Sequence, residues 1–279
     1  MLNQIQPMSR YYSLLLVSFL FLGCRKASEE IPAYIKSNSS KVISTNLGEP
    51  TSEIYGLHFS VETDDRGTWQ FPFLAPVLKD GIKSVVIRPV VKKNNISTLF
   101  MEYPFYKIKV IDLNLIRGKE IDTQINFEYV DSISMLTNET MEIKTNFSSS
   151  ERSVNAASGN YSMKLNVDMN TVDSTITSFY YKSLDMSPEK EVYMEFDYYM
   201  PNGILAPALS FTNSNGNIAV AYSENYLTPN SKWTHVYWYL SPVIRGQGLT
   251  QFTPVFLLTL EKGGSKSEAY IDNIRILEK

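Results

Sequence analysis

The chain has 279 residues, of which 13% are aromatic, with a formal net charge of −3 and a single cysteine. It contains no basic block and no arginine-aromatic stripe, which argues against nucleic acid and anionic lipid as partners. One cysteine excludes a disulfide framework, and only two histidines leave little material for a histidine-based metal site.

The first 24 residues predict export and lipid attachment. Leu14–Leu22 is an almost entirely apolar run that follows Arg10 and is shorter than the roughly 20 residues of a transmembrane helix. Phe21-Leu22-Gly23-Cys24 resembles the lipobox of bacterial lipoproteins, which implies a diacylglycerol on Cys24. The alternative is a secretory signal with an incidental cysteine. We predict a signal peptide over residues 1–23 and attachment to a membrane through lipid on Cys24.

The residues after the cysteine predict where in the cell envelope the protein is located. Arg25 follows Cys24, in place of the aspartate that resembles an inner-membrane retention signal. Glu29-Glu30 resembles the acidic export tags of Bacteroidetes lipoproteins, which implies the outer membrane and a location facing the cell exterior. Residues 24–52 are polar and rich in turn formers, and they predict a lipidated tether that contains a strand at Lys41–Thr45.

Residues 53–130 predict a small β-sandwich. Alternating apolar and polar residues in Ile54–Val61 are typical of a half-buried strand, and turn residues separate the strands that follow. The further expected strands are Thr68–Phe73, Ser84–Val91, Phe105–Leu115 and Ile121–Val130. Leu74-Ala75-Pro76-Val77 followed by a valine-rich strand resembles PEGA-like and Ig-like repeats of bacterial envelope proteins. Residues 24–130 resemble uncharacterised Bacteroidetes surface lipoproteins, on Glu30–Ile35, Asn95-Ile96-Ser97 and Tyr103–Tyr106. This resemblance implies a spacer or interaction domain without catalytic residues.

Residues 131–279 predict an eight-stranded jelly roll, so the whole chain is expected to be all-β. The expected strands are Gly159–Val167, Thr175–Tyr181, Glu191–Met200, Ala206–Thr212, Ile218–Tyr222, Trp233–Leu240, Thr253–Leu260 and Ser267–Ile276. Three segments resemble non-catalytic carbohydrate-binding modules of the galactose-binding-like class: Ser158–Leu165, Lys232–Val236 and Ala269–Ile276. The resemblance implies a jelly-roll fold and sugar binding.

Few residues suggest chemistry. His58 and His235 belong to different predicted domains, so a Ser-His-Asp triad within one domain is hard to build, and we expect no enzymatic activity. Alternation places Trp238 in the core. Trp233 could offer a flat ring to a sugar face, but in the resembling folds this tryptophan packs in the core, so we expect it there. The aromatic residues that remain as platforms for a sugar face are Trp69, Tyr198, Tyr199, Tyr222 and Tyr226.

Asp272 and two serines carry further predictions. In related jelly rolls the acid of the terminal strand often joins a structural calcium site, which implies calcium at Asp272; the alternative is an aspartate that caps a neighbouring turn. We expect no other cofactor. Asp131-Ser132-Ile133 and Asp173-Ser174-Thr175 resemble Bacteroidetes O-glycosylation acceptors, which implies glycans on Ser132 and Ser174.

The leading hypothesis from these observations is an outer-membrane, surface-exposed lipoprotein whose jelly roll binds extracellular glycan without catalysis. The main alternative is a structural or adhesion protein that makes protein–protein contacts with envelope or host proteins. A hydrolase with an unrecognised active site is the third.

Overall fold

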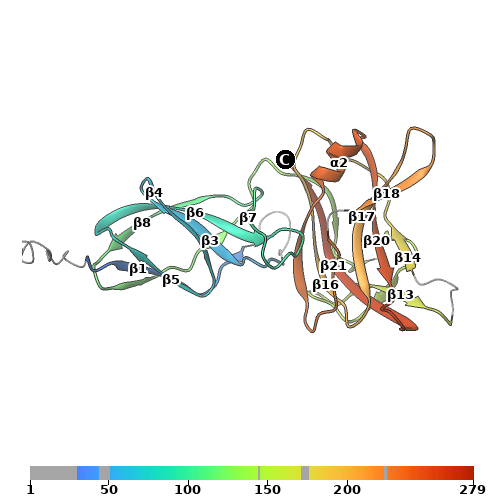
Figure 1. The fold of residues 1–279 in the computed structure, drawn as a ribbon, viewed down its shortest axis with the longest axis horizontal. Coiled ribbons are helices and arrows are strands. Elements are labelled where there is room, and N and C mark those ends of the chain that lie inside the picture. Colours follow the sequence, from blue (N-terminus) through green and yellow to red (C-terminus); the bar gives the residue numbers. More distant parts are fainter. Residues whose placement is uncertain (1–29, 44–50, 144, 171–175, 223–224) are drawn as a thin grey trace, which may run out of the picture.

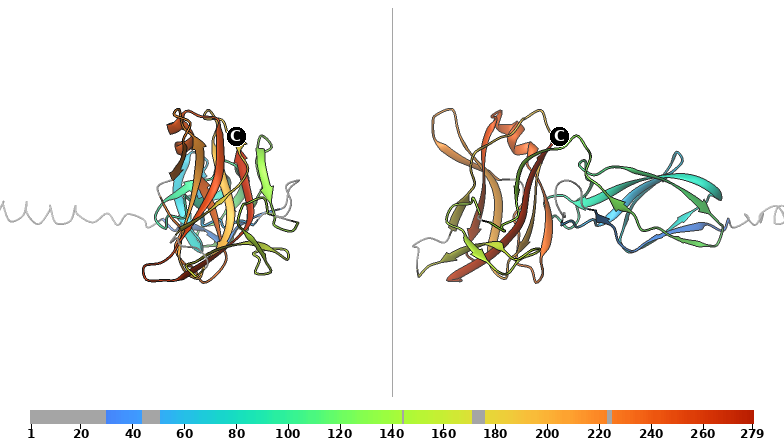
Figure 2. Two further views of the ribbon diagram at one scale, coloured as in Figure 1. Left: turned by 90° about the vertical axis from the view of Figure 1, so that its right-hand side faces the viewer. Right: turned by 180° about the vertical axis from the view of Figure 1, so that it is seen from behind.

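The computed structural model describes residues 30–43, 51–143, 145–170, 176–222 and 225–279. Two β-sandwiches follow one another along its long axis, as Figures 1 and 2 show. Apart from one short helix, α2 (Ser241–Gln247), the regular elements in these residues are strands. The predicted all-β fold with two sandwiches is therefore confirmed.

The small sandwich has a main sheet facing two smaller sheets. The main sheet runs β4-β3-β6-β7, and its fifth strand β8 also pairs with β6. These strands are β3 (Gly56–Val61), β4 (Asp64–Gln70), β6 (Gly81–Lys92), β7 (Phe100–Glu102) and β8 (Lys109–Leu115). The facing strands are β1 (Ala33–Ser37), β5 (Phe73–Val77) and β9 (Glu120–Asp122), with β2 (Lys41–Val42) beside β10 (Asn126–Phe127).

The predicted tether over residues 24–52 is wrong in part, because β1 is a strand of the small sandwich. β2 lies within the strand predicted at Lys41–Thr45 and belongs to the same sandwich. Ala33 and Ile35 are buried in its core, and β1 pairs antiparallel with β5 and parallel with β9. A five-residue strand with only two strongly apolar inward positions is too short for its periodicity to stand out in a polar stretch. β1 forms a strand because it pairs with β5 and β9, which lie some 40 and 85 residues further along the chain.

The jelly roll consists of two antiparallel sheets. The interface sheet, which faces the small sandwich, is formed by β11 (Ser134–Glu139), β12 (Glu151–Ser153), β13 (Ser162–Asp168), β16 (Val192–Tyr199), β19 (Thr234–Tyr239) and β21 (Lys266–Glu278). The open sheet, on the side away from the small sandwich, is formed by β14 (Ile176–Tyr180), β15 (Leu184–Asp185), β17 (Ile204–Thr212), β18 (Ile218–Tyr222) and β20 (Gln251–Thr259). The eight predicted strands coincide with eight of these to within a few residues.

Alternation along the strands fills the space between the two sheets. Phe252, Phe256 and Leu258 of β20 point inward from the open sheet, and Met194 and Phe196 of β16 belong to the same buried cluster. Trp238 is fully buried there, as the sequence predicts. Burying one such large side chain stabilises the fold by about 2–3 kcal/mol, so this layer holds the jelly roll together.

The two sandwiches meet in a buried contact rather than through an exposed linker. Tyr193, Tyr237 and Leu277 of the interface sheet pack into the core of the small sandwich. The hydroxyls of Tyr103 and Tyr129, from the small sandwich, donate to the two carboxylate oxygens of Glu195 at 2.6 and 2.5 Å. Glu195 lies fully buried in β16.

A turn of the small sandwich also covers the free edge of β19. The backbone N–H of Asn94 donates to the carbonyl of Tyr237 at 3.0 Å, and the side-chain oxygen of Asn94 accepts from the N–H of Tyr239 at 2.7 Å. Asn94 has a positive φ of 51°, a conformation that asparagine tolerates better than most residues. An edge strand with unpaired backbone groups is a site for unwanted pairing, and this turn occupies it.

Candidate functional site

The outer face of the open sheet carries the best candidate site. On β20, Thr253, Val255 and Leu257 point away from the core, while their neighbours point into it. In the strand register Thr253 lies opposite Ser210 of β17, and Val255 lies opposite Tyr180 of β14. The face therefore changes from apolar around Val255 to hydroxyl-bearing around Thr253.

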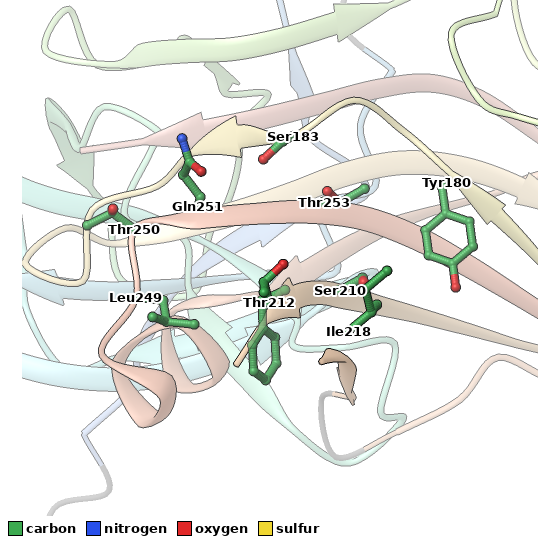
Figure 3. A pocket seen from close by; sticks show the side chains of 10 residues that line it. Tyr180, Ser183, Ser210, Thr212, Ile218, Leu249, Thr250, Gln251 and Thr253 are labelled. Carbon is green, nitrogen blue, oxygen red and sulfur yellow. The ribbon is translucent and has the colours of Figure 1, made fainter. Parts of the chain in front are cut away.

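A pocket of about 630 Å³ lies at the hydroxyl-bearing end of this face. Figure 3 shows its lining side chains on neighbouring strands and on the loop before β20. The lining residues are Tyr180, Ser183, Ser210, Phe211, Thr212, Ile218, Leu249, Thr250, Gln251 and Thr253. None of the ten carries a charge. The volume is in the range of pockets that hold a small ligand or a few units of a polymeric ligand.

The polar groups of this pocket are available to a ligand. Six of the lining residues carry hydroxyls and Gln251 carries an amide, and within the described residues no protein hydrogen bond is recorded for any of these seven side chains. Hydroxyls and amides both donate and accept, so they match a ligand that does the same. Tyr180 and Ile218 add apolar surface at the edge. The arrangement suits a neutral, hydroxyl-rich ligand with apolar faces.

The sequence reasoning did not find this pocket. Tyr180, Ser210 and Thr253 come from three strands that only the fold brings together. The available signal was the outward-facing series of residues 253, 255 and 257 on the predicted strand Thr253–Leu260, which changes from polar to apolar along its length.

A row of aromatic side chains on the interface sheet is a second candidate surface. Tyr199 of β16 lies between Trp233 and Tyr270, with ring centroids 6.1 and 5.8 Å away. All three rings are partly exposed, so the prediction that Trp233 packs in the core is wrong. The reason is its alternation with His235, which places Trp233 on the outer face of the sheet.

The other predicted aromatic platforms are scattered. Tyr198 is buried, and its hydroxyl receives a hydrogen bond from Asn95 at 3.2 Å. Trp69 is half-buried in the small sandwich and donates from its ring nitrogen to a backbone carbonyl. Tyr226 is exposed in the loop after β18, and the side chain of Tyr222 lies outside the described residues. Trp69, Tyr198 and Tyr226 are not among the residues that line the pocket.

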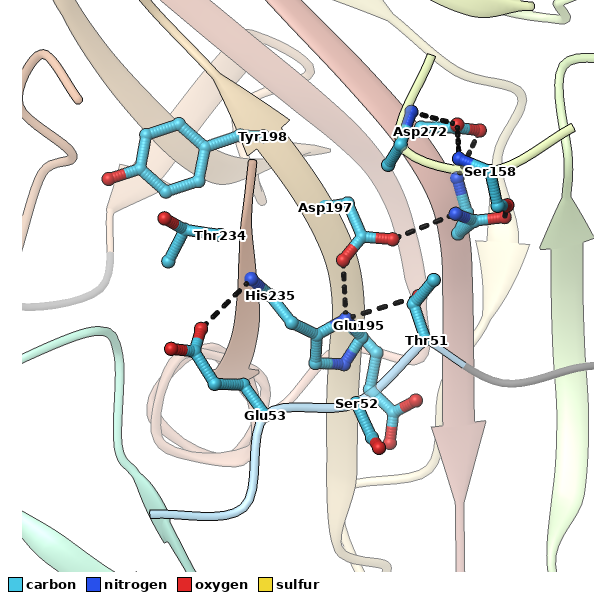
Figure 4. A network of polar contacts seen from close by, with 12 residues as sticks. Thr51, Ser52, Glu53, Ser158, Glu195, Asp197, Tyr198, Thr234, His235 and Asp272 are labelled. Atoms are coloured by element: carbon cyan, nitrogen blue, oxygen red, sulfur yellow. Dashed lines mark hydrogen bonds and ion pairs between the residues drawn. The ribbon is translucent and has the colours of Figure 1, made fainter. Parts of the chain in front are cut away.

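His235 belongs to a buried polar network between the sandwiches, which Figure 4 shows. Its Nδ1 lies 2.8 Å from Asp197 Oδ1 and 3.4 Å from the hydroxyl of Thr51, and Asn273 donates to Asp197 Oδ2 at 2.8 Å. Burial acts to lower the pKa of His235, but the Asp197 carboxylate outweighs it and raises that pKa. A triad needs the acid and the nucleophile on opposite ring nitrogens, whereas here both oxygens face Nδ1. The network is therefore not arranged as a hydrolase triad.

His58 lies on β3 of the small sandwich, whereas His235 lies on β19 of the jelly roll. The Nε2 of His58 is 3.0 Å from Asp65 Oδ1, and its Nδ1 is 3.1 Å from the hydroxyl of Thr68. Among the described residues, no group of three or more His, Cys, Asp or Glu side chains is placed to hold a metal ion.

Asp272 caps a loop. Its Oδ2 accepts from the backbone N–H groups of Ala157 and Ser158 at 3.0 and 3.2 Å, and its Oδ1 accepts from the N–H of Asn273 at 2.8 Å. Burial raises the pKa of Asp272 to about 6 despite these donors. Calcium needs oxygen ligands, whereas three N–H donors point at this carboxylate. The residues here fit the capping alternative and do not fit a calcium ion, whose presence stays a prediction.

Of the three predicted modification sites, the structure describes only Ser132. Cys24, with the signal peptide over residues 1–23, lies outside the described residues, and so does Ser174. Ser132 is exposed in the turn before β11, next to Asp131, which contacts Lys107 at 2.8 Å. Its glycosylation stays a prediction. Across the described part of the chain, no helix has the length and apolar character needed to cross a bilayer.

Comparison with known proteins adds solved structures only, since neither a family model nor a curated protein matches the chain. A xylan-binding domain from Paenibacillus barcinonensis is 12% identical over 53% of this chain and 97% of its own, with a TM-score of 0.39. A family 11 carbohydrate-binding module from Clostridium thermocellum, in complex with a mixed-linked tetrasaccharide, is 16% identical over 52% and 94%, with a TM-score of 0.37.

A third similar structure is the enzymatically active domain of tailspike protein 4 of bacteriophage CBA120, which is 12% identical over 52% of this chain and 19% of its own, with a TM-score of 0.34. The fold of the present chain is defined by its own strand order. That strand order makes the C-terminal half of the chain a jelly roll. Its open sheet carries an uncharged pocket lined largely by hydroxyl groups.

Proposed function

We propose that the jelly roll binds neutral glycan at the pocket of the open sheet and catalyses no reaction. The observation that carries this proposal is a pocket with seven uncharged hydrogen-bonding side chains, apolar surface and no charged lining residue. Sugars present hydroxyls that donate and accept and C–H faces that pack on rings, so their chemistry matches this lining. A carboxylated glycan would lose its hydration here without finding a cation.

The proposed function includes a location. Cleavage of residues 1–23 and a lipid on Cys24 would hold the chain in the outer membrane, with the small sandwich next to the membrane and the jelly roll beyond it. The position of the open sheet on the side away from the small sandwich supports this arrangement, because the pocket would then face the cell exterior. The O-glycans on Ser132 and Ser174 belong to the same proposal.

Binding is tested by titration calorimetry of residues 25–279 against soluble neutral polysaccharides and a matched set of acidic ones. We expect binding of one or more neutral polysaccharides and none of the acidic ones. Tyr180→Ala should weaken that binding by about 1 kcal/mol, a factor of roughly five, and Thr253→Val should weaken it without changing the melting temperature.

The matched control is Trp233→Ala, which removes a partly exposed ring from the other face of the jelly roll. If Trp233→Ala abolishes binding and Tyr180→Ala does not, the glycan site lies on the aromatic row and the pocket assignment is wrong. Silence across the whole panel from folded protein would favour the protein-interaction alternative.

The anchor is tested separately by metabolic labelling with a clickable fatty acid. Cys24→Ser should abolish the label, and a label that persists in this variant would contradict the proposed lipoprotein. Protease treatment of intact cells then reports whether the chain is exposed at the surface.

A further inference from the structure

The end of the small sandwich remote from the jelly roll is built from three loops that touch. The N–H of Gly118 donates to the carbonyl of Pro32 at 2.8 Å, and the N–H of Tyr34 donates to the carbonyl of Lys119 at 2.9 Å. Gly81 lies opposite Leu115 in the strand register. Residues 30–32, 78–82 and 116–119 therefore form one surface, which we call the tip.

The tip lies far from the interface with the jelly roll. β6 runs the length of the small sandwich, from Gly81 at the tip to Lys92, which precedes the turn that covers β19. Eleven residue steps in a strand span roughly 35 Å. Figure 1 shows the first described residues at this end, next to the start of β1.

Four large aliphatic side chains are exposed at the tip. Ile31, Leu78, Ile82 and Ile116 have exposed fractions of 60%, 57%, 74% and 50%. Ile31, Leu78 and Ile116 lie in loops, where polar residues are usual, and Ile82 is the second residue of β6. A cluster of exposed aliphatic residues marks an interaction surface more often than scattered single ones do.

Most of the charges around these side chains are paired, and acids nearly balance bases: Glu30, Glu62 and Asp80 against Lys79, Lys83, Arg117 and Lys119. Glu62 lies 3.5 Å from Lys79 and 3.2 Å from Lys83, and Asp80 lies 3.1 Å from Arg117. This pairing reduces the attraction for an anionic partner that unpaired lysines would provide. The tip is therefore an apolar patch whose rim of acidic and basic side chains is nearly balanced in charge.

The chain itself indicates what lies next to the tip. Seven residue steps separate Cys24 from Ile31, which at full extension reach about 25 Å at most. A lipid on Cys24 would hold the tip within that distance of the bilayer. We propose that the tip rests on the membrane surface, with its four aliphatic side chains in the interfacial layer. This inference rests on the proposed lipid anchor.

The consequence would be a fixed orientation. A lipid on a short segment holds a protein near the membrane but lets it tilt, whereas a second apolar contact at the base limits the tilt. The long axis of the two sandwiches would then stand away from the bilayer. The pocket, on the far side of the jelly roll, would be held at the greatest distance from the membrane.

The test uses full-length, acylated protein reconstituted into phosphatidylcholine vesicles. With Cys24 acylated, Ile82→Cys supplies the one free thiol, and it is labelled with an environment-sensitive nitrobenzoxadiazole dye. Ile218→Cys is the matched control, since Ile218 is 76% exposed but lies on the open sheet. We expect a blue-shifted emission and at least threefold slower quenching by aqueous iodide at position 82 than at position 218, at both low and high salt.

Equal quenching at the two positions would overturn the membrane contact. Shielding of position 82 in native outer membranes but not in phosphatidylcholine vesicles would also overturn it, because the tip would then contact a protein. Adding Ile31→Asp and Ile116→Asp to the Ile82→Cys protein should restore quenching. Mass spectrometry of the same preparation reports acylation of Cys24, so failure of the anchor is distinguished from failure of the tip.

Discussion

The two outer faces of the jelly roll differ in how their polar groups are satisfied. On the interface sheet, Glu195 and Asp197 are buried and accept hydrogen bonds from side chains of the small sandwich and of neighbouring strands. On the open sheet, the hydroxyls of Ser210 and Thr253 line a pocket and make no hydrogen bond to another group in the described part of the chain. A buried polar group without a partner destabilises the fold, so the interface sheet must stay covered by the small sandwich. The hydroxyls of the open sheet are instead free to bind a ligand.

This comparison also shows what the small sandwich contributes. Tyr103, Tyr106 and Tyr129 place three hydroxyls against the interface sheet, and burial raises the pKa of each well above its usual value. These phenols therefore remain protonated donors across the physiological range. The small sandwich completes the interface sheet, in addition to any role as a spacer.

The largest expected effect is on the free energy of unfolding, when a side chain in the core of the jelly roll is compared with one on its outer face. Trp238→Ala should cost about 3–5 kcal/mol of unfolding free energy, because it leaves a large cavity between the two sheets. Trp233→Ala should cost about 1 kcal/mol, because its ring is already partly solvated. Urea unfolding of both variants measures the difference, and equal losses would contradict the outward position of Trp233.

The next effect concerns the covered face. Glu195→Ala should cost about 3 kcal/mol, because it leaves two buried tyrosine hydroxyls without an acceptor. The matched change on the open face, Thr253→Val, should stay within about 0.5 kcal/mol. If both changes cost the same, the two faces do not differ in the way described.

Much of the fold follows from local periodicity, and much of the site does not. Eight of the eleven described jelly-roll strands are predictable because residues such as Met163, Leu165 and Val167 alternate strictly with polar neighbours, whereas β11, β12 and β15 are not predicted. The place of β1 in the small sandwich and the pocket at Tyr180 depend on contacts between distant segments. The alternation of residues along β19 could have predicted the outward position of Trp233, but the resemblance to related folds favoured a position in the core.

A smaller effect appears in the pH dependence of stability. The pKa of Asp272 is raised from 3.8 to about 6, so the folded state favours its protonated form. This contribution is fully present below pH 3.8 and is lost as the pH rises through about 6. The stability advantage of the wild type over Asp272→Asn should therefore shrink by on the order of 2 kcal/mol between pH 4 and pH 7. Urea unfolding at several pH values measures it, and a widening gap would contradict the raised pKa.

The smallest expected effect is that of metal removal at the same carboxylate. Because three backbone N–H groups already point at the oxygens of Asp272, a calcium ion would have to displace donors that hold the loop at Ala157 and Ser158. Treatment with EDTA should leave the melting temperature unchanged within about 1 °C, and added calcium should not raise it. The control is Asp272→Asn, whose loss of stability should be the same with and without calcium. A calcium-dependent rise of several degrees in the wild type, absent from Asp272→Asn, would instead establish the ion site predicted from the terminal strand, and the loop would then have to rearrange to expose carbonyl oxygens.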